Sequence, residues 1–492
     1  MSGGAAECDV AVIGGGPAGL TAALRLATAG LSVVIVDEQP ELGGQYYRRP
    51  SPAMLARGID HRPAGGRLIA AVRAAGVDCR TGTSVWGVGD DGRTLLTCPV
   101  LGPATPGTLK GRYVVVATGA YERLVPFPGW DLPGVTTAGF AQHLAAADGV
   151  AVGQRVLLAG SGPFLLPVAC SLLELGVSVA GIAEAGVPYR VSSQGALTAA
   201  RFPARLVELA GYAARLARHR VPVWQDRIVA RADADQSGRR VGSVTLAATG
   251  APATPVATVR ADALCVGMGF RPQAELPRLL GCAMRPDPRS GELMPAADAT
   301  GRSGESDLYL AGEAAGIGGA RRAMADGEVV AAAILAREGR VGPRREPTAR
   351  VRHLARQQRF ADAVARLYPA GSELARGLGR ALPDEARVCR CEAVTVGQIR
   401  AAAAAIGSPA DPGAVSALTR AGMGPCQGRE CLATVAALCG QAADLSAQSA
   451  PVTERLAITR MPVRPVPLAT IAALSLSSSP APPARGAGQA TP

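Results

Sequence analysis

The first forty residues constrain the fold of this chain more than any other stretch. An apolar run at residues 10–13 is followed by a glycine-rich turn, by LTAALRLATAG with helical spacing, and by the apolar run LSVVIVD. This order predicts a buried strand, a tight turn, a helix and a second strand parallel to the first. A sheet that begins in this way belongs to the α/β class, with helices covering its faces.

The turn itself, GGGPAG, has the spacing of a dinucleotide-binding site. In such a turn the first glycine permits a tight bend, the second lets the backbone approach a pyrophosphate, and the third lets helix and strand pack closely. An acidic residue at the end of the second strand can accept hydrogen bonds from ribose hydroxyls. An ordinary glycine-rich turn is the competing interpretation. The candidate binding residues in this segment are Gly14, Gly16, Pro17, Ala18, Gly19, Asp37 and Glu38.

Three later stretches favour FAD over NAD as the bound dinucleotide. They are ELGGQ at residues 41–45, the apolar strand GRYVVVATGA at 111–120, and SDLYLAGEAAGIGGA at 306–320, which leads into a helix. They resemble the flavin-contacting segments of the two-dinucleotide-binding-domain flavoproteins, the superfamily that includes thioredoxin reductase and glutathione reductase. The resemblance implies FAD contacts at Gly44, Gln45, Thr118, Gly119, Gly312, Glu313 and Gly319.

Two details separate this chain from the disulfide reductases of that superfamily. Glu313 stands where the superfamily carries an aspartate toward the ribityl chain of the flavin, and it is one methylene longer. Neither residues 43–49 nor residues 133–142 contain a cysteine, whereas the reductases keep a cysteine pair beside the flavin. We therefore expect no dithiol chemistry at the flavin.

A second nucleotide-like module follows at residues 154–186. It repeats the order of strand, turn, helix and strand, and Gly160 and Gly162 take the first two glycine positions. The third position is Leu165, whose bulk is expected to hold the helix away from the strand, and Pro167 removes a backbone amide near the helix start. Glu184 is placed to hold a ribose. A site for NAD or another adenosine ligand at Gly160, Gly162 and Glu184, and a relic without a ligand, both stay open.

Four cysteines near the end of the chain form the pattern Cys389-x-Cys391 and Cys426-x4-Cys431. Short helices are predicted between the two pairs, so the pairs can converge. Four thiolates suit zinc or an iron–sulfur cluster, and the absence of any metal is a third possibility. The region resembles the 2Fe-2S domain of bacterioferritin-associated ferredoxin, a small helical ferredoxin-like iron–sulfur domain. That resemblance implies that all four cysteines are ligands of a 2Fe-2S cluster.

Nearly the whole chain resembles one protein family. The motifs PFPGWDLPGVTTAGFAQ (126–142), VCRCE (388–392) and GMGPCQGREC (422–431) are similar to those of the alpha subunits, which carry FAD and 2Fe-2S, of bacterial heteromeric amine dehydrogenases. That family includes opine oxidase, hydrogen cyanide synthase, and the proline and D-hydroxyproline dehydrogenases. Membership implies an oxidoreductase that relays electrons from an opine, proline, hydroxyproline or glycine. It also implies two partners, a second flavoprotein (beta) subunit with its own flavin and a small ferredoxin subunit.

Catalytic residues for substrate oxidation are not identifiable, because the chain has four histidines and none of them belongs to a recognisable triad. A self-contained NAD(P)H-dependent reductase is the alternative function, and a regulatory protein that senses zinc or iron is a third. The expected segments are an FAD-binding domain in two parts (1–125 and 286–340), an inserted nucleotide-binding-like domain (126–285), an Arg-rich helical linker (341–385), a 2Fe-2S domain (386–445), and a C-terminal strap with a disordered tail (446–492).

Composition and charge narrow the choice of partners. The net charge of +12 is carried almost wholly by arginine, and nine arginines cluster between Arg337 and Arg366 with Phe360 as the single aromatic residue among them. We interpret this cluster as a solvated helix face or a docking surface for an acidic partner, and not as a nucleic-acid site. No signal-peptide pattern or apolar run of membrane-spanning length is visible. We expect a cytoplasmic protein without an integral membrane segment.

Overall fold

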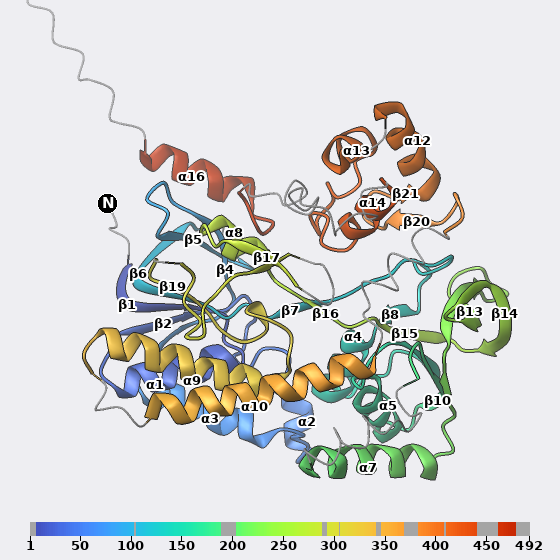
Figure 1. Ribbon diagram of the computed structural model, residues 1–492, viewed down its shortest axis with the longest axis horizontal. Helices are drawn as coiled ribbons and strands as arrows, with labels where there is room; N and C mark the ends of the chain where they lie inside the picture. Colours follow the sequence, from blue (N-terminus) through green and yellow to red (C-terminus); the bar gives the residue numbers. More distant parts are fainter. Residues whose placement is uncertain are drawn as a thin grey trace, which may run out of the picture.

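The computed structural model describes residues 6–102, 105–187, 203–287, 293–304, 306–340, 346–368, 382–407, 410–439 and 461–478. The described chain folds into two α/β units, a small helical unit and a C-terminal helix (Figure 1). Residues 341–345 and 369–381 of the predicted linker, residues 440–460, and residues 479–492 of the predicted tail lie outside the described residues.

The first unit is built on a seven-stranded sheet in the order β3-β2-β1-β6-β5-β4, with β19 also paired to β6. Its inner strands run parallel, and β4 and β5 continue the sheet as an antiparallel extension. β2 is buried at every position, as expected for a parallel strand covered on both faces. The strands are β1 (Ala6–Ile13), β2 (Val33–Val36), β3 (Asp78–Arg80), β4 (Thr83–Val88), β5 (Thr94–Pro99), β6 (Gly107–Val116) and β19 (Leu308–Leu310).

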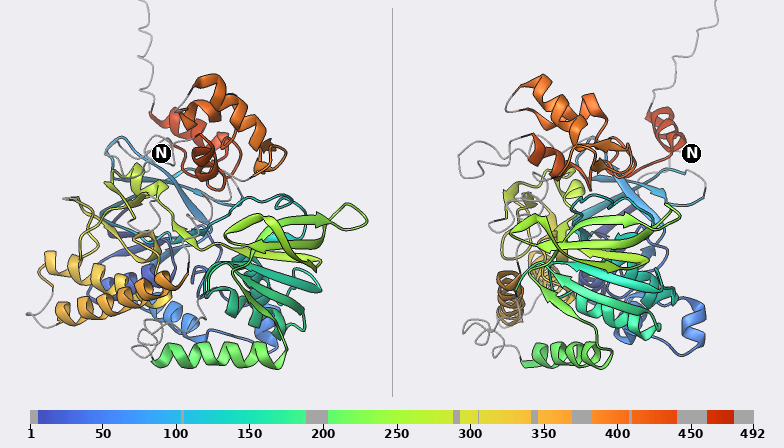
Figure 2. Two further views of the ribbon diagram at one scale, coloured as in Figure 1. Left: turned by 45° about the vertical axis from the view of Figure 1, so that its right-hand side comes forward. Right: turned by 90° about the vertical axis from the view of Figure 1, so that its right-hand side faces the viewer.

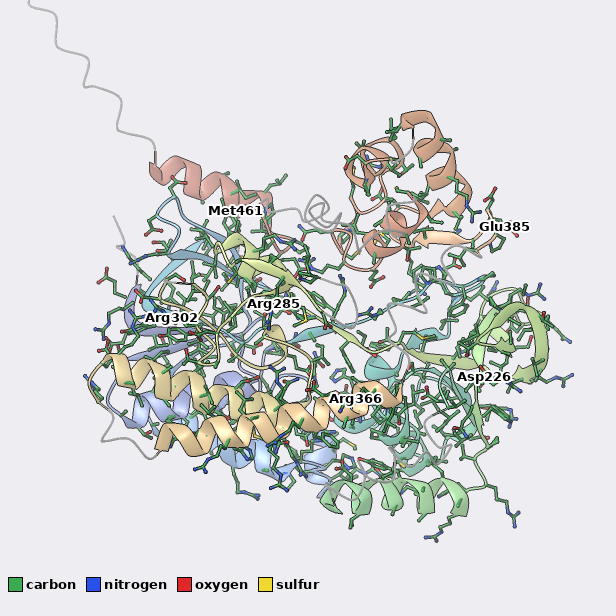
Figure 3. The ribbon with its side chains drawn as sticks, viewed as in Figure 1. Asp226, Arg285, Arg302, Arg366, Glu385 and Met461 are labelled. Carbon is green, nitrogen blue, oxygen red and sulfur yellow. The ribbon has the colours of Figure 1, made fainter. Side chains whose placement is uncertain are left out.

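Helices cover one face of this sheet. α1 (Pro17–Thr28), α3 (Pro63–Ala74) and α9 (Ala320–Arg337) bury their apolar residues in one core with β1 and β2. α10 (Glu346–Leu367) lies along α9, and Arg366 in its last turn is at the end that approaches the second unit (Figure 3). The remaining short elements are α2 (Pro52–Ala56), α8 (Glu275–Leu279), the 3-10 turn η2 (Gly312–Ala314), β17 (Met284–Pro286) and β18 (Leu293–Pro295).

The second unit is inserted between β6 and β19. Its parallel sheet has the order β11-β10-β9-β15-β8, and an antiparallel sheet of β12, β13 and β14 packs against it in a shared core. Its elements are β8 (Val135–Thr137), α4 (Ala138–His143), the π-helix η1 (Leu144–Asp148), β9 (Arg155–Gly160), α5 (Leu165–Glu174), β10 (Ser178–Glu184), α7 (Pro203–Arg218), β11 (Val223–Gln225), β12 (Ile228–Ala234), β13 (Val241–Ala248), β14 (Ala251–Arg260) and β15 (Ala263–Gly267).

A two-stranded ribbon joins the two α/β units. β7 (Ala120–Glu122) leads out of the first unit and pairs antiparallel with β16 (Phe270–Pro272), which leads back. After β16 the chain re-enters the first unit at once, because Leu276 and Cys282 already belong to its core. The return therefore precedes residue 285, where the sequence placed the boundary.

The third unit contains the four cysteines and stands to one side of both α/β units (Figure 2). It consists of β20 (Arg387–Cys389), β21 (Val394–Thr395), α12 (Val396–Ile406), α13 (Pro412–Thr419) and α14 (Leu432–Leu438), with its own apolar core. A capping box between Thr395 and Gln398 begins α12, so the helix start is specified locally. α16 (Leu468–Ser478) follows near the end of the described chain.

Candidate cofactor sites

Both glycine turns open into one cavity of about 2050 Å³. That volume exceeds the range of roughly 300–1,000 Å³ typical of a site for one small ligand, so the cavity has room for an extended dinucleotide. Its wall includes all but one of the residues predicted to contact FAD: Gly14, Gly16, Pro17, Ala18, Asp37, Glu38, Gly44, Gln45, Thr118, Gly119, Gly312, Glu313 and Gly319. The exception is Gly19, which lies beneath the wall.

The three glycines of the first turn have the separate roles that their spacing predicts. A Cβ on Gly14 would lie 2.4 Å from the carbonyl oxygen of Ala117, and Gly14 has a φ of +106°. A Cβ on Gly19 would lie 2.0 Å from the carbonyl oxygen of Gly14, so α1 can sit on β1 only without a side chain there. At Gly16 the nearest atom to a Cβ would be 3.9 Å away, on Gly44. Gly16 therefore presents open backbone to the cavity.

The acidic residues that follow β2 lie at one end of this cavity. Asp37 is buried, and its carboxylate accepts hydrogen bonds from the amides of Gly15 at 2.5 Å and Gln39 at 2.7 Å. Burial raises the pKa of Asp37 above its ordinary value, and the two amides oppose that rise. Glu38 forms an ion pair with Arg464 at 3.1 Å. Asp37 thus orders the turn as well as facing the cavity.

Glu313 is turned toward the start of α9. Its carboxylate accepts a hydrogen bond from the amide of Gly319 at 3.1 Å and another from Gly318, and burial raises its pKa. The carboxylate therefore takes up amides that the helix start would otherwise offer to a ligand. Groups that could hydrogen-bond to a ligand remain elsewhere on the cavity wall. The buried Thr118 Oγ1 has no hydrogen-bond partner among the described residues, and Gly119 and Gly319 face open space. These features fit a bound polar group.

The second turn is built on a related plan. A Cβ on Gly160 would lie 1.9 Å from the carbonyl oxygen of Gly267, while a Cβ on Gly162 would meet open space on the cavity wall. Glu184 accepts hydrogen bonds from the amides of Gly162 at 3.1 Å and Gly186 at 2.9 Å, and burial raises its pKa. In the described structure Glu184 is not part of the cavity wall. The predicted ribose-holding role therefore stays a prediction.

Leu165 fits between the cavity, which it lines, and the adjacent strand β15. It is the first residue of α5, its side chain is 2% exposed, and its Cδ2 would lie 3.1 Å from a Cβ on Gly267. Gly267, on the adjacent strand β15, supplies the space that the bulk of Leu165 needs. Pro167 falls in the first turn of α5, where its missing amide costs no intrahelical hydrogen bond.

The four cysteines of the third unit form two pairs. The side chains of Cys391 and Cys426 are hydrogen-bonded to each other, as are those of Cys389 and Cys431. Burial, and then the neighbouring Cys389 and Cys426, raises the pKa of Cys431. No three His, Cys, Asp or Glu side chains in the described parts of the chain surround a common point as a single metal ion would require. Two adjacent thiol pairs instead fit a cluster of two irons, each held by two thiolates.

Glycine lets the two cysteine segments approach each other. A Cβ on Gly424 would lie 2.2 Å from the Cβ of Cys391, so the loop before Cys426 can reach that position only without a side chain. Of the four cysteines, Cys391 is exposed, Cys426 is half-buried, and Cys389 and Cys431 are buried. The cluster site therefore has one side that is open to solvent.

The PFPGWDLPG stretch has a physical role that sequence reasoning did not assign. The Trp130 indole donates to the carbonyl oxygen of Arg387 at 2.8 Å, and the Arg390 guanidinium lies 4.8 Å from the centre of the Trp130 ring. Arg387 also pairs with Asp131 at 2.7 Å. The stretch anchors the cysteine unit beside Cys389.

Sequence reasoning also missed two parts of the cavity wall. The predicted linker contributes α10, whose Gln358, Phe360 and Val364 line the cavity, and the C-terminal segment contributes Val463 and Arg464. The spacing of Phe360 and Val364, four residues apart among arginines, is a signal of a buried helix face. Nothing comparable marks Arg464, because its partners are remote in sequence.

Comparison with known proteins adds to this geometry. Residues 8–327 match the family described as "Pyridine nucleotide-disulphide oxidoreductase", and residues 387–440 match the "BFD-like [2Fe-2S] binding domain". The A subunit of opine oxidase from Rhizobium meliloti is 34% identical over 95% of this chain and 98% of its own length. The chain belongs to the family of opine oxidase A subunits.

Two further comparisons extend this family. Hydrogen cyanide synthase subunit HcnB of Pseudomonas aeruginosa is 33% identical, over 86% of this chain and 90% of its own length. The solved structure of L-proline dehydrogenase from P. horikoshii has the same fold, with a TM-score of 0.64 and 22% identity over 96% of this chain and 81% of its own. The expected fold, two dinucleotide-binding units followed by a small iron–sulfur unit, is confirmed.

Family membership also fixes the cofactor class. The chain is a flavin-dependent oxidoreductase with an FAD-binding fold, a second dinucleotide-binding unit and a 2Fe-2S domain. None of the helices in the described parts of the chain is both long and apolar enough to cross a bilayer.

Proposed function

We propose that this chain is the FAD- and 2Fe-2S-containing subunit of a complex that dehydrogenates an amino or imino acid. The observation that carries the proposal is the joining, in one chain, of a dinucleotide cavity and two thiol pairs. The unit that holds the thiol pairs bonds to Trp130 and, through Arg429, to Glu275 in the cavity wall. The relatives that match most of this chain are named as subunits of opine oxidase and of hydrogen cyanide synthase. These names support an opine, proline, hydroxyproline or glycine as the electron donor of the complex.

When bound, FAD supplies a two-electron acceptor and the 2Fe-2S cluster supplies a one-electron carrier, which together suit an electron relay. We assign contacts with the FAD pyrophosphate to the open backbone at Gly16, and contacts with its ribose to Asp37. α10 shields the cavity from water with Phe360 and Val364. Cys389, Cys391, Cys426 and Cys431 hold the cluster.

Substrate oxidation is assigned to a partner protein of the complex. Two histidines, His61 and His143, line the cavity, and His143 is the last residue of α4. Burial, followed by the adjacent Arg48 guanidinium at 3.2 Å, lowers the pKa of His143. A neutral imidazole held against an arginine is a poor proton shuttle for an amine. The relatives are named as subunits, which supports two partners, a second flavoprotein (beta) subunit with its own flavin and a small ferredoxin subunit. No disulfide joins any of the eleven cysteines, all of which lie in described parts of the chain, and this supports a cytoplasmic location.

One observation favours a second candidate function. Gly162 opens into the same cavity as Gly16, so a nicotinamide nucleotide at the second turn would share the space assigned to FAD. A self-contained NAD(P)H-dependent reductase would use this arrangement. Pro163 and Pro167 reduce the number of amides near that turn, which favours the relay.

An anaerobic spectral titration tests the proposal. The purified chain, alone and with its co-purified partner subunits, is titrated with NADH and then with proline, hydroxyproline, glycine and an opine. We expect the flavin and cluster bands to bleach only with an amino or imino acid and only with the partner present. A Cys391→Ser chain is the control, in which the flavin should bleach without the cluster bands. Bleaching of the isolated chain by NADH would instead establish the self-contained reductase.

A further inference from the structure

The described residues 461–464, Met461 to Arg464, which we name the strap, run along the edge of the first unit. The amide of Val463 donates to the carbonyl oxygen of Trp86 in β4 at 2.8 Å, and the amide of Val88 lies 3.3 Å from the Met461 sulfur. The side chain of Val463 is 6% exposed and joins the core of that unit. Met461 marks the start of the strap in Figure 3.

The other side of the strap contacts the cluster loop, residues 424–431, which carries Cys426 and Cys431. Gln427 Nε2 donates to the carbonyl oxygen of Pro462 at 2.9 Å, and the Arg429 guanidinium donates to the carbonyl oxygen of Val463. Arg429 also pairs with Glu275 of α8 at 3.4 Å. The strap is therefore packed between the FAD-binding unit and the cluster loop, and it bonds to both.

Arg464, the last residue of the strap, lies in the wall of the cavity. Its guanidinium pairs with Glu38 at 3.1 Å, donates to Gln273 Oε1 at 2.6 Å and donates to the Tyr121 hydroxyl. All three partners line the cavity with it, and the Arg464 side chain is 19% exposed. The three partners come from the end of β2, from β7 and from the segment after β16, so Arg464 joins parts of the wall that are remote in sequence.

Tyr121 connects the wall to the cluster loop. Its ring centre lies 5.7 Å from the guanidinium of Arg464 and 5.7 Å from that of Arg429, so one ring contacts both arginines. Arginine guanidinium groups stack on aromatic rings, and such contacts are stronger where water is excluded. A movement of the Arg464 side chain therefore changes its contact with the Tyr121 ring, and a shift of that ring changes the contact with Arg429.

We propose that the strap completes the ribose end of the FAD cavity and holds the cluster loop against it, with Arg464 as the positioning residue that couples FAD binding to the seating of the loop. The ribose end is identified by Glu38, which follows Asp37 at the end of β2. The inference rests on the assignment of the cavity to FAD, and it is independent of the substrate proposed above. Coupling between two equilibria is reciprocal. If the seated cluster loop strengthens FAD binding, FAD binding must in turn stabilise the seated loop.

The test compares Arg464→Met with Arg400→Met in the full chain. Methionine keeps much of the length of the Arg464 side chain and loses three charge-assisted contacts, whereas Arg400 is a half-exposed arginine that pairs with Asp384 at the surface of the cysteine unit. FAD affinity is measured by flavin fluorescence on deflavinated protein, and hydrogen exchange of residues 424–431 is measured with and without FAD. The EPR signal of the reduced cluster reports that the cluster is assembled.

We expect Arg464→Met to weaken FAD binding roughly tenfold or more, since contacts to charged groups are worth about one decade or more in affinity. FAD should slow exchange in the cluster loop of the wild type and of Arg400→Met, and should not do so in Arg464→Met. Arg464→Lys should recover part of the affinity, because lysine keeps the charge and loses the planar fork.

Gln427→Ala separates the two roles of the strap. It removes the bond to Pro462 without touching the cavity wall, so FAD affinity should stay within about threefold of the wild type while the effect of FAD on loop exchange is reduced. It also serves if Arg464→Met does not fold. The proposal is overturned if Arg464→Met binds FAD as the wild type does, or if FAD slows loop exchange equally in all variants. No readout uses an amine, so failure here is distinct from failure of the proposed function.

Discussion

The two glycine turns of this chain solve the same packing problem in different ways. In each, the first glycine fits against a carbonyl of the neighbouring strand, Ala117 in one case and Gly267 in the other. In each, a buried carboxylate accepts a hydrogen bond from an amide of the turn, from Gly15 to Asp37 and from Gly162 to Glu184. The shared features concern how the turn is held, and they say little about what it binds.

The difference lies at the third position. Gly19 lets α1 rest directly on the turn, whereas Leu165 fills the equivalent place and relies on Gly267 for space. The requirement for a small residue has moved from the helix to the adjacent strand. A turn that departs from the glycine pattern can therefore keep its packing, and the departure alone does not show that the site has lost its ligand.

The largest expected effect comes from giving the first turn the residue of the second. Gly19→Leu would drive a side chain into the carbonyl oxygen of Gly14, only 2.0 Å from the Cβ position, and no glycine on a neighbouring strand makes room. We expect a loss of about 4 kcal/mol or more in the free energy of unfolding, with no FAD recovered on purification. Thermal unfolding and flavin content are the measurements.

Thr28→Leu, at the exposed end of the same helix, is the control and should leave both quantities near the wild type. A stable, flavin-loaded Gly19→Leu protein would mean that α1 can shift as easily as the second unit has adapted to Leu165. The two turns would then be interchangeable, which the contact distances argue against.

The reverse change has a smaller effect. Leu165→Gly removes a fully buried side chain and leaves a void beside Gly267, which should cost about 3 kcal/mol in the free energy of unfolding. FAD content should persist, because Leu165 lines the cavity at the second turn and not at the turn assigned to FAD. Urea unfolding checks the first expectation and the absorbance spectrum the second. A gain in NADH affinity without loss of stability would instead show that Leu165 blocks a nucleotide site.

Local pattern was sufficient to predict the strands, the turns and the wall residues near Gly14 and Gly312, because each lies within a few residues of the signal that marks it. Arg464 could not be predicted, since its contacts with Glu38, Tyr121 and Gln273 exist only after the chain has passed through the cysteine unit and returned. Leu165 was misjudged for a related reason: its space is provided by Gly267, more than a hundred residues away. The sequence therefore predicted the glycine turns, and it did not predict the contacts between remote residues that complete the cavity wall.

Alanine at the second glycine compares the two turns as ligand sites. A methyl group at Gly16 meets nothing closer than 3.9 Å, so Gly16→Ala should fold normally and weaken FAD binding roughly ten- to a hundredfold by occupying the space that the pyrophosphate needs. Gly162→Ala also meets open space, although its φ of +125° adds strain of about 1–3 kcal/mol. Calorimetric titration with FAD and NADH measures both. An unchanged FAD affinity in Gly16→Ala would place the pyrophosphate elsewhere.

The smallest expected effect concerns the two carboxylates. Burial raises the pKa of Asp37 and of Glu184 above their ordinary values of 3.8 and 4.5, so each binds a proton more readily in the folded state. Their contribution to stability is therefore complete below about pH 4 and is lost as the pH rises through the folded-state pKa, by about 1.4 kcal/mol for each unit of displacement. Asp37→Asn and Glu184→Gln remove this titration, and the melting temperature of deflavinated protein should fall less between pH 4.5 and 7.5 in either variant than in the wild type.

FAD should change the pH dependence of stability at the first turn and not at the second. Asp37 faces the cavity and Glu184 does not, so FAD should reduce the pH dependence that arises from Asp37 by supplying hydroxyl donors to the charged carboxylate, and should leave that of Glu184 as it is. Glu385→Gln, an exposed change in the cysteine unit, is the control that should alter neither slope. If FAD changed the slope for Glu184 as well, the ligand would reach the second turn, and the cavity would have to be regarded as one continuous binding site for both.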